Sequence, residues 1–360
     1  MAVSGLSLLL FALRCDGRWF EAHVFLPQQF FLVASPAIAT FVRLAAGLSG
    51  ALLLLLVPFL PRGAAGWRVS AAVLLSLLAA EGLLRWRVRP LVRQELTPMM
   101  RTLTDWSPRY GQSFRPGMDL LLPLSGRQVR IQTDGEGRRI PGSPIDPSLP
   151  SLVFTGESTV AGIGLRWEET FPALLGSRLG LQAVNLGSPA YRADQSWLRL
   201  HDGLRDLPHP RAVIGIFMPG LIARSFWGQL HPPPRPSPAV GFEQTLRVPP
   251  SGLQATGFYL LWRHLYWSDA AVTEGMRSLG ESYRDMAALA QARGVPCVFL
   301  VTGHTPPWMA RELFEKQGLD FVVVEVPAEE LLADGHPGAR GNQRIADALE
   351  ARLRTRLANR

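Results

Sequence analysis

A serine, a histidine and an aspartate in this 360-residue sequence could together carry out nucleophilic chemistry. Ser158 follows an apolar run, Leu152-Val153-Phe154, and a short turn, and two glycines come soon after it. His336 and Asp334 lie near the other end of the chain, in the segment Asp334-Gly335-His336-Pro337. A serine hydroxyl is a weak nucleophile unless a neighbouring base takes its proton, and an aspartate can orient such a base. The three residue types are therefore the parts of a nucleophilic hydrolase.

Each of these residues also has a purely structural interpretation. A serine at the end of a strand often caps the helix that follows. A histidine ahead of a helix can simply be a polar residue that leads into it. Neither signal is specific alone, and the layout of the two segments together favours the hydrolase.

Between these segments, short apolar runs alternate with stretches of helical periodicity. They predict strands at residues 152–155, 182–186, 212–217, 295–301 and 321–326, and helices at 168–179, 194–204, 272–293, 307–317 and 340–357. This alternation is typical of a mostly parallel sheet with helices on both faces. We therefore expect an α/β fold, a three-layer α/β/α sandwich. Ser158 would lie at the carboxyl end of a strand, where open α/β sheets bind ligands.

The N-terminal part of the chain is much more apolar. Residues 44–60 carry no charge, and residues 69–84 carry only Glu81. A membrane-spanning helix needs about 20 apolar residues. Residues 38–60 and 67–85 therefore predict a transmembrane helical hairpin over 38–86, although a buried core hairpin is the alternative and Glu81 favours it. Residues 1–37 would form a separate N-terminal head, without a recognisable signal-peptide cleavage site.

Two further segments interrupt the α/β rhythm. Residues 87–150 are rich in turn-forming residues and predict an irregular linker. Within the main domain, residues 151–360, the segment 226–267 combines a proline-rich run with several aromatic side chains. We expect an exposed insertion there. It could be a lid, a membrane contact or a partner surface, or a local cluster that only covers the insertion.

Composition argues against several classes of function. The formal net charge is +8, but it comes almost entirely from arginine, since Lys316 is the only lysine. This bias towards arginine is compositional, so we expect no nucleic-acid partner. Cys15 and Cys297 are the only cysteines, which argues against a disulfide scaffold or a thiolate metal site. We expect neither a metal nor a cofactor.

From about residue 110 to 357 the sequence resembles the SGNH (GDSL-type) hydrolases, a superfamily of esterases, lipases and carbohydrate acyl esterases. Three segments match the family's blocks in the same order: Gly156-Glu157-Ser158, Asn185-Leu186-Gly187 and Asp334-Gly335-His336. The turn that contains Asp134 and Arg138, and the end of the apolar region at residues 79–85, resemble membrane-anchored members. The resemblance implies the flavodoxin-like sandwich of that family.

The resemblance also implies a role for each site residue. Ser158 would be the nucleophile, His336 the general base, and Asp334 the residue that orients the imidazole. The backbone N–H groups of Ser158 and Gly187 would face the oxyanion, with Asn185 in the same block.

The third block departs from the family. It normally supplies Gly-X-Asn-Asp after the third strand, and its asparagine side chain completes the oxyanion hole. Here the strand is followed by Met218-Pro219-Gly220. Gly220 could occupy the position, but it offers only a backbone donor.

Two functions follow from these observations. The first is a membrane-anchored SGNH-type serine hydrolase or acyltransferase acting on acyl esters of an envelope lipid or glycan. The second is a catalytically weakened or inactive accessory subunit of a membrane protein complex, docked through the hairpin and the aromatic insertion. The expected location is the inner membrane, with two passes. The arginines after residue 84 place the main domain in the cytoplasm by the positive-inside rule, whereas the resemblance implies the periplasm.

Overall fold

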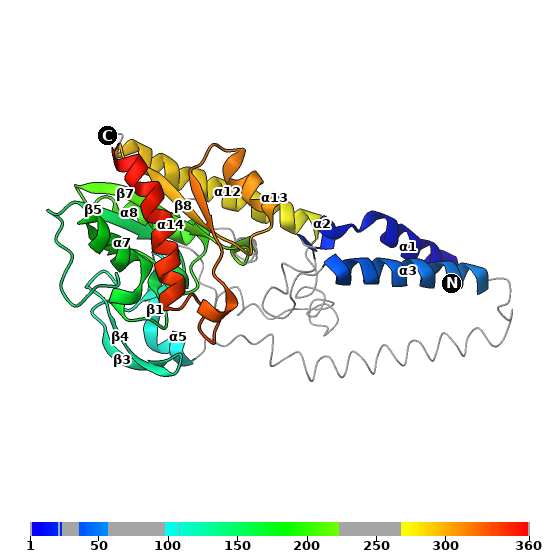
Figure 1. Ribbon diagram of the computed structural model, residues 1–360, viewed down its shortest axis with the longest axis horizontal. Helices are drawn as coiled ribbons and strands as arrows, with labels where there is room; N and C mark the ends of the chain where they lie inside the picture. The colour runs from blue at the N-terminus through cyan, green and yellow to red at the C-terminus, as the bar shows by residue number, and fades with distance from the viewer. Residues whose placement is uncertain are drawn as a thin grey trace. The chain divides into compact units, whose positions relative to one another are not determined.

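The computed structural model describes residues 2–20, 22–23, 36–56, 98–107, 109–222 and 268–358 (Figure 1). The chain divides into two compact units, Met1–Glu95 with Val248–Thr273, and Leu96–Arg247 with Glu274–Arg360. The second unit holds Ser158, Asp334 and His336. The predicted second hairpin helix, 67–85, and the whole of the predicted insertion at 226–267 lie outside the described residues.

The described part of the first unit is mainly a pair of packed helices. α1 (Ala2–Arg14) packs along α3 (Pro36–Leu56), and the short α2 (Gly17–Phe20) follows α1. Two glycines allow the close approach, since a Cβ atom on Gly5 would lie 2.8 Å from the carbonyl oxygen of Gly50. α1, which belongs to the predicted head at residues 1–37, therefore packs directly on the first helix of the predicted hairpin.

Large apolar side chains remain on the outside of this pair. Those at least half exposed are Leu6, Leu10 and Leu13 of α1, and Phe41, Leu44, Leu48, Leu52 and Leu55 of α3. Their spacing of three or four positions places them in a stripe along each helix. Exposed apolar surface of this kind is typical of a protein or membrane contact. None of the helices in the described part of the chain is both long enough and apolar enough to cross a membrane.

The second unit is built on a sheet of five parallel strands in the order β6-β5-β7-β8-β9. The strands are β5 (Ser151–Thr155), β6 (Gln182–Asn185), β7 (Pro210–Phe217), β8 (Cys297–Thr302) and β9 (Phe321–Val324). The five predicted strands are confirmed. Because the chain moves from β5 to β6 in one direction and to β7 in the other, the strand order reverses beside β5, and open sheets bind ligands at such a point.

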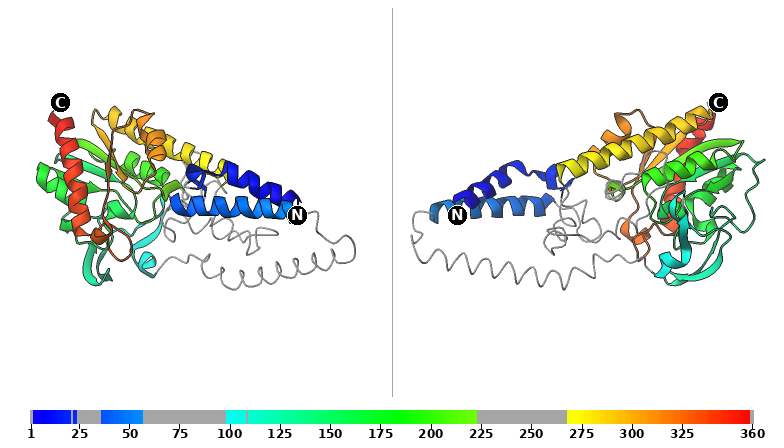
Figure 2. Two further views of the ribbon diagram at one scale, coloured as in Figure 1. Left: turned by 45° about the vertical axis from the view of Figure 1, so that its right-hand side comes forward. Right: turned by 180° about the vertical axis from the view of Figure 1, so that it is seen from behind.

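Helices cover both faces of this sheet (Figures 1 and 2). They are α7 (Phe171–Leu179), α8 (Ala193–Gly203), α12 (Asp269–Ala292) and α14 (Ala339–Ala358). α7 and α14 bury one face, where Leu152 and Phe154 of β5 join the same core as Leu349. α8 and α12 lie on the other face, where the ring of Tyr283 packs 5.2 Å from that of Phe299. The predicted three-layer α/β/α architecture is thus confirmed.

Two predicted helices are interrupted. The stretch 168–179 begins as a single 3-10 turn, η3 (Trp167–Glu169), and α7 then starts at Phe171. Thr170 separates the two because it is extended and its hydroxyl accepts the N–H of Ala173, as an N-cap does. The stretch 307–317 divides into α13 (Pro307–Ala310) and a π-helical turn, η6 (Arg311–Glu315).

The predicted irregular linker is wrong for its described part. After α5 (Pro98–Leu103) come two hairpins, β1 (Thr104–Ser107) with β2 (Gly111–Phe114), and β3 (Asp119–Leu124) with β4 (Arg127–Gln132). Ser125 and Gly126 join β3 to β4, and both have positive φ angles, 49° and 75°, which is the geometry of a tight hairpin turn. The buried side chains of these hairpins pack against Ala161 and Ile163. The turn-forming residues therefore close hairpins that support the segment after Ser158.

Candidate active site

Ser158 is the first residue of a one-turn helix, α6 (Ser158–Ala161), just beyond the end of β5. Gly156 lets the chain pass close to β7, since a Cβ there would lie 2.3 Å from Cγ2 of Ile216. Glu157 caps α6 by accepting the N–H of Thr159 at 3.1 Å, and Gly162 ends it with a φ of 68°. The half-buried Ser158 thus stands at the carboxyl end of the sheet.

His336 and Asp334 lie on the loop between η7 (Ala328–Glu330) and α14. This loop closes on itself, because the N–H of Leu332 donates to the carbonyl of His336 at 2.7 Å and Gly335 turns the chain with a φ of 86°. As a result, Nε2 of His336 lies 2.7 Å from Oγ of Ser158. Nδ1 of the same ring lies 3.1 Å from Oδ1 of Asp334. The structure therefore brings together the three residues that the sequence singled out.

This arrangement suits proton transfer from the serine. The hydrogen bond with His336 lowers the pKa of the Asp334 carboxyl against the opposing effect of its partial burial, so Asp334 is an anion at neutral pH. An anion facing Nδ1 favours a proton on that nitrogen. The lone pair of Nε2 then faces Ser158, which is the orientation a general base needs.

Two of the predicted oxyanion residues are used inside the fold. The N–H of Gly187 donates to Oδ1 of Asn185 at 2.9 Å. The Nδ2 group of Asn185, which is fully buried, donates to the carbonyl of Val160 at 2.7 Å. Gly187 is also tightly packed, since a Cβ there would lie 2.8 Å from the backbone nitrogen of Ala161. In this structure, these two residues support α6 and do not present donors to a substrate.

The remaining candidate donors are backbone N–H groups at the ends of two neighbouring strands. The N–H of Ser158, at the start of α6, has no acceptor among the described residues. Gly220 is buried shortly after β7, the strand that pairs with β5, and its N–H likewise has no acceptor in the described part of the chain. An oxyanion hole at this site would therefore depend on Ser158 and on the segment around Gly220.

Glu157 has a closer relation to the nucleophile than the sequence indicated. The sequence indicates Glu157 only as the middle residue of the first matching block, Gly156-Glu157-Ser158. In the structure its side chain is 1% exposed, and Oε2 contacts Oγ of Ser158. No signal in the sequence distinguished this contact from a simple helix cap.

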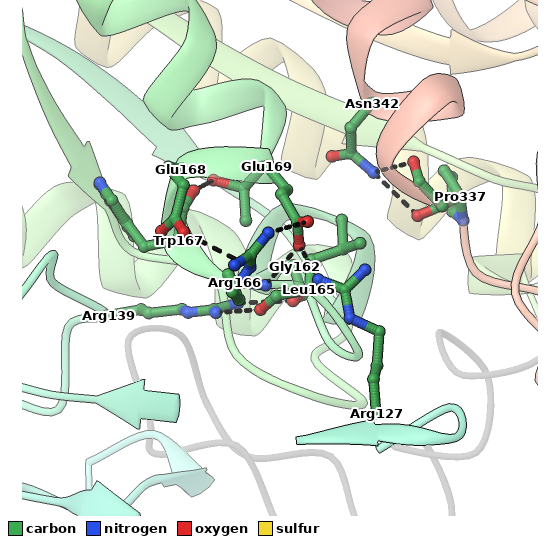
Figure 3. Close-up of polar contacts among 12 residues, drawn as sticks. Arg127, Arg139, Gly162, Leu165, Arg166, Trp167, Glu168, Glu169, Pro337 and Asn342 are labelled. Carbon is green, nitrogen blue, oxygen red and sulfur yellow. Dashed lines mark hydrogen bonds and ion pairs between the residues drawn. The ribbon is translucent and has the colours of Figure 1, made fainter. Parts of the chain in front are cut away.

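Arg139 supports the segment that follows the nucleophile (Figure 3). This side chain is 1% exposed and donates to the carbonyl oxygens of Ala161, Gly162 and Leu165. Burial lowers the pKa of its guanidinium to about 10, so it remains charged at neutral pH. The sequence had drawn attention to the preceding residue, Arg138, which instead forms an ion pair with Asp134.

Glu169 connects the β3–β4 hairpin to the same region (Figure 3). Its carboxylate accepts hydrogen bonds from the side chain of Arg127 and from the backbone and side chain of Arg166. Burial opposes ionisation of this carboxyl, but the hydrogen bonds outweigh burial and lower its pKa to about 2. The hairpin is thus tied to η3, which follows the nucleophile segment.

Asn342, in the first turn of α14, links α7 to the base loop, whose Pro337 it contacts (Figure 3). Its Oδ1 accepts the N–H of Phe171 at 2.9 Å, a group that has no partner within its own helix. Its Nδ2 donates to the carbonyl oxygens of Pro337 at 2.8 Å and Gly338 at 3.1 Å. Because Pro337 directly follows His336, Asn342 fixes the backbone beside the base.

No family model matches the sequence, and no curated protein sequence matches it. Among solved structures, the chain is similar to a protein from Desulfitobacterium hafniense DCB-2 that is described as lipolytic and of the G-D-S-L family. The identity is 14%, the match covers 56% of this chain and 98% of that chain, and the TM-score is 0.35.

The chain is also similar to an acetyl xylan esterase from the rumen bacterium Butyrivibrio proteoclasticus. The identity is 13%, with 66% of this chain and 72% of that chain covered and a TM-score of 0.38. Likeness at this level assigns no function, so the functional conclusion depends on the geometry of Ser158, His336 and Asp334.

Proposed function

We propose that this chain is a serine hydrolase or acyltransferase that acts on acyl esters. The observation that carries the proposal is the 2.7 Å contact between Oγ of Ser158 and Nε2 of His336. Asp334 completes the set, 3.1 Å from the other ring nitrogen. A nucleophile, a base and a residue that orients the base are the parts required for covalent acyl transfer.

In the proposed reaction, Oγ of Ser158 attacks the ester carbonyl carbon while its proton passes to Nε2 of His336. The ester C–O bond then breaks, the alcohol leaves with the proton from His336, and the acyl group stays on Ser158. Water or an acceptor alcohol attacks this acyl group, assisted by the same base, and frees the serine. The charge on the carbonyl oxygen would be met by the N–H of Ser158 and a second donor, for which Gly220 is the candidate.

Labelling with a fluorophosphonate probe tests this proposal, because such probes react with activated serines. The purified protein should take up the probe, and Ser158→Ala should not. Ser177→Ala is a matched control, since Ser177 is an exposed serine of α7 in the same domain. Hydrolysis of short acyl esters of p-nitrophenol should show the same pattern. A folded wild-type protein that neither labels nor turns over would contradict the proposal.

We further propose that the hydrolase domain is held at a membrane by its N-terminal unit and acts on esters of an envelope lipid or glycan. The exposed apolar stripes of α1 and α3 support attachment to a lipid phase. The uncharged stretches at residues 44–60 and 69–84, the latter interrupted only by Glu81, support the two-pass hairpin. Sedimentation with membranes should therefore require residues 1–95. A full-length protein that is recovered entirely in the soluble fraction contradicts this proposal.

For the side of the membrane we propose the periplasm, following the resemblance. Protease added to intact spheroplasts should then cleave within residues 230–240. Protection of that segment, with cleavage only after lysis, places the domain in the cytoplasm instead.

One observation favours a second function, that of a catalytically weakened accessory subunit of a membrane protein complex. The N–H of Gly187 donates a hydrogen bond to Oδ1 of Asn185 and is not directed at a substrate. The segment after β7 has no asparagine that could supply an oxyanion donor in its place. Loss of one oxyanion donor typically slows catalysis by about 10²–10³. Under this function Ser158→Ala would leave the biological role intact, whereas changes at Trp262 or Trp267 would disrupt assembly. Ester turnover that disappears in Ser158→Ala excludes it.

A further inference from the structure

Two basic groups contact the hydroxyl of the proposed nucleophile. Oγ of Ser158 lies 2.7 Å from Nε2 of His336, and Oε2 of Glu157 contacts the same oxygen. The Glu157 side chain is 1% exposed, and its other oxygen is fixed by the N–H of Thr159. The carboxylate is therefore held in place at the hydroxyl.

A serine hydroxyl has one proton and can donate it to only one of these neighbours. If Ser158 donates to His336, its contact with Glu157 is a hydrogen bond only when Glu157 is protonated and donates to Oγ. If Ser158 donates to an ionised Glu157, then His336 must donate from Nε2. Because Asp334 faces Nδ1, the ring is in that case an imidazolium. The two arrangements contain the same number of protons and differ in whether Glu157 or His336 carries the shared one.

We propose that Glu157 is a positioning residue that competes with His336 for the Ser158 proton and favours a resting form in which His336 is charged. A charged His336 cannot accept the proton of Ser158, so the site is restrained until the shared proton leaves or moves to Glu157. This inference rests on the proposed function, since it concerns the nucleophile and base named there.

Other charged or titratable groups face this cluster. Asp334, on the loop that carries His336, also stabilises the imidazolium. From α12, the hydroxyl of Tyr283 donates to the carbonyl of Ile216 at 2.9 Å, and both burial and the charge on Glu157 raise the pKa of that hydroxyl. Tyr283 therefore stays neutral and adds no second negative charge beside Glu157. The test must accordingly change Glu157 and leave Asp334 in place.

Glu157→Gln separates the charge from the helix cap. The amide oxygen can still accept the N–H of Thr159, while the amide N–H₂ can donate to Oγ and leave the serine proton for His336. In ¹⁵N NMR of histidine-labelled protein, the pH at which His336 titrates should fall by about one unit or more, the usual effect of an opposite charge within about 4–6 Å. His336→Gln identifies the signal among the seven histidines.

Glu157→Asp gives a second, milder variant, because it keeps the charge but withdraws it by one methylene. The titration midpoint of His336 in Glu157→Asp should fall between those of wild type and Glu157→Gln. If the Gln variant does not fold, the midpoint in Glu157→Asp should still lie below that of wild type. Equal titration of His336 in wild type and in a folded variant overturns the proposal, and Glu157 is then only the cap of α6.

Fluorophosphonate labelling keeps this proposal distinct from the proposed function. At a pH below the titration midpoints of all variants, more His336 is neutral in Glu157→Gln than in wild type. A midpoint that is lower by one pH unit should therefore make labelling about tenfold faster. If the midpoint of His336 falls while no variant labels, the competition is real and the proposed hydrolase is wrong. If all variants label at the same rate and His336 titrates unchanged, the hydrolase stands and the competition is excluded.

Discussion

Replacing Asn342 with alanine removes the polar link between the base loop and α7 without touching Ser158, His336 or Asp334. The buried N–H of Phe171 and the carbonyl of Pro337 lose their side-chain partner, whereas Gly338 keeps the backbone hydrogen bond from residue 342. A buried polar group left without a partner costs about 1–3 kcal/mol. The buried N–H of Phe171 alone predicts that the free energy of unfolding falls by about 1–3 kcal/mol, and the part-buried carbonyl of Pro337 adds less because water can replace its partner.

The same change should also slow acyl transfer in molecules that remain folded. Pro337 directly follows His336, and a displacement of about 1 Å between reacting groups can cost about 10² in rate. Urea unfolding and the rate of fluorophosphonate labelling measure the two effects. Gln343→Ala is the control, since Gln343 is the exposed neighbour on α14 and should change stability by less than about 0.5 kcal/mol. An Asn342→Ala protein that matches this control in both assays refutes the reasoning.

Three other changes test the supports of the site. Arg139→Met leaves the carbonyls of Ala161, Gly162 and Leu165 without their donor. Urea unfolding should therefore show that the free energy of unfolding falls by about 3 kcal/mol or more. An unchanged urea midpoint would contradict the role of Arg139 as a support of this segment. Gly187→Ala should lower the free energy of unfolding by about 1–3 kcal/mol through overpacking against α6, and it should slow fluorophosphonate labelling. If stability and labelling rate are both unchanged, α6 can shift to accommodate the added methyl group. Glu169→Gln removes a carboxyl whose folded pKa of about 2 lies below its ordinary 4.5. The stability advantage of wild type over this variant should be full above about pH 4.5 and disappear as the pH falls towards 2, so parallel curves of unfolding free energy against pH contradict the assignment.

The sheet could be predicted because its strands are short apolar runs separated by helical stretches. Ser158 and His336 lie 178 positions apart, yet both follow strands of one parallel sheet, whose carboxyl ends share an edge. Residue chemistry and the block order were therefore enough to expect their contact. The hairpins at residues 104–132 escaped prediction because β1, β2 and β4 mix polar with apolar residues and lie among turn formers, so they do not stand out as apolar runs.

Side-chain detail could not be predicted in the same way. Whether the N–H of Gly187 faces a substrate or Asn185 depends on how one amide side chain is oriented. Arg138 and Arg139 are adjacent residues of one type, and only the path of the backbone decides which of them is buried. Asn342 carries no motif, since its partners lie in α7 and in the base loop and come together only in the folded domain.

The central claim is that His336 activates Ser158 as a nucleophile. Mass spectrometry of the purified full chain after reaction with a fluorophosphonate measures this directly, by intact mass and by mapping the modified peptide. The account predicts one adduct per chain, located on Ser158, that is absent in Ser158→Ala and strongly reduced in His336→Gln. A folded protein without an adduct, or with an adduct that persists in Ser158→Ala, contradicts it.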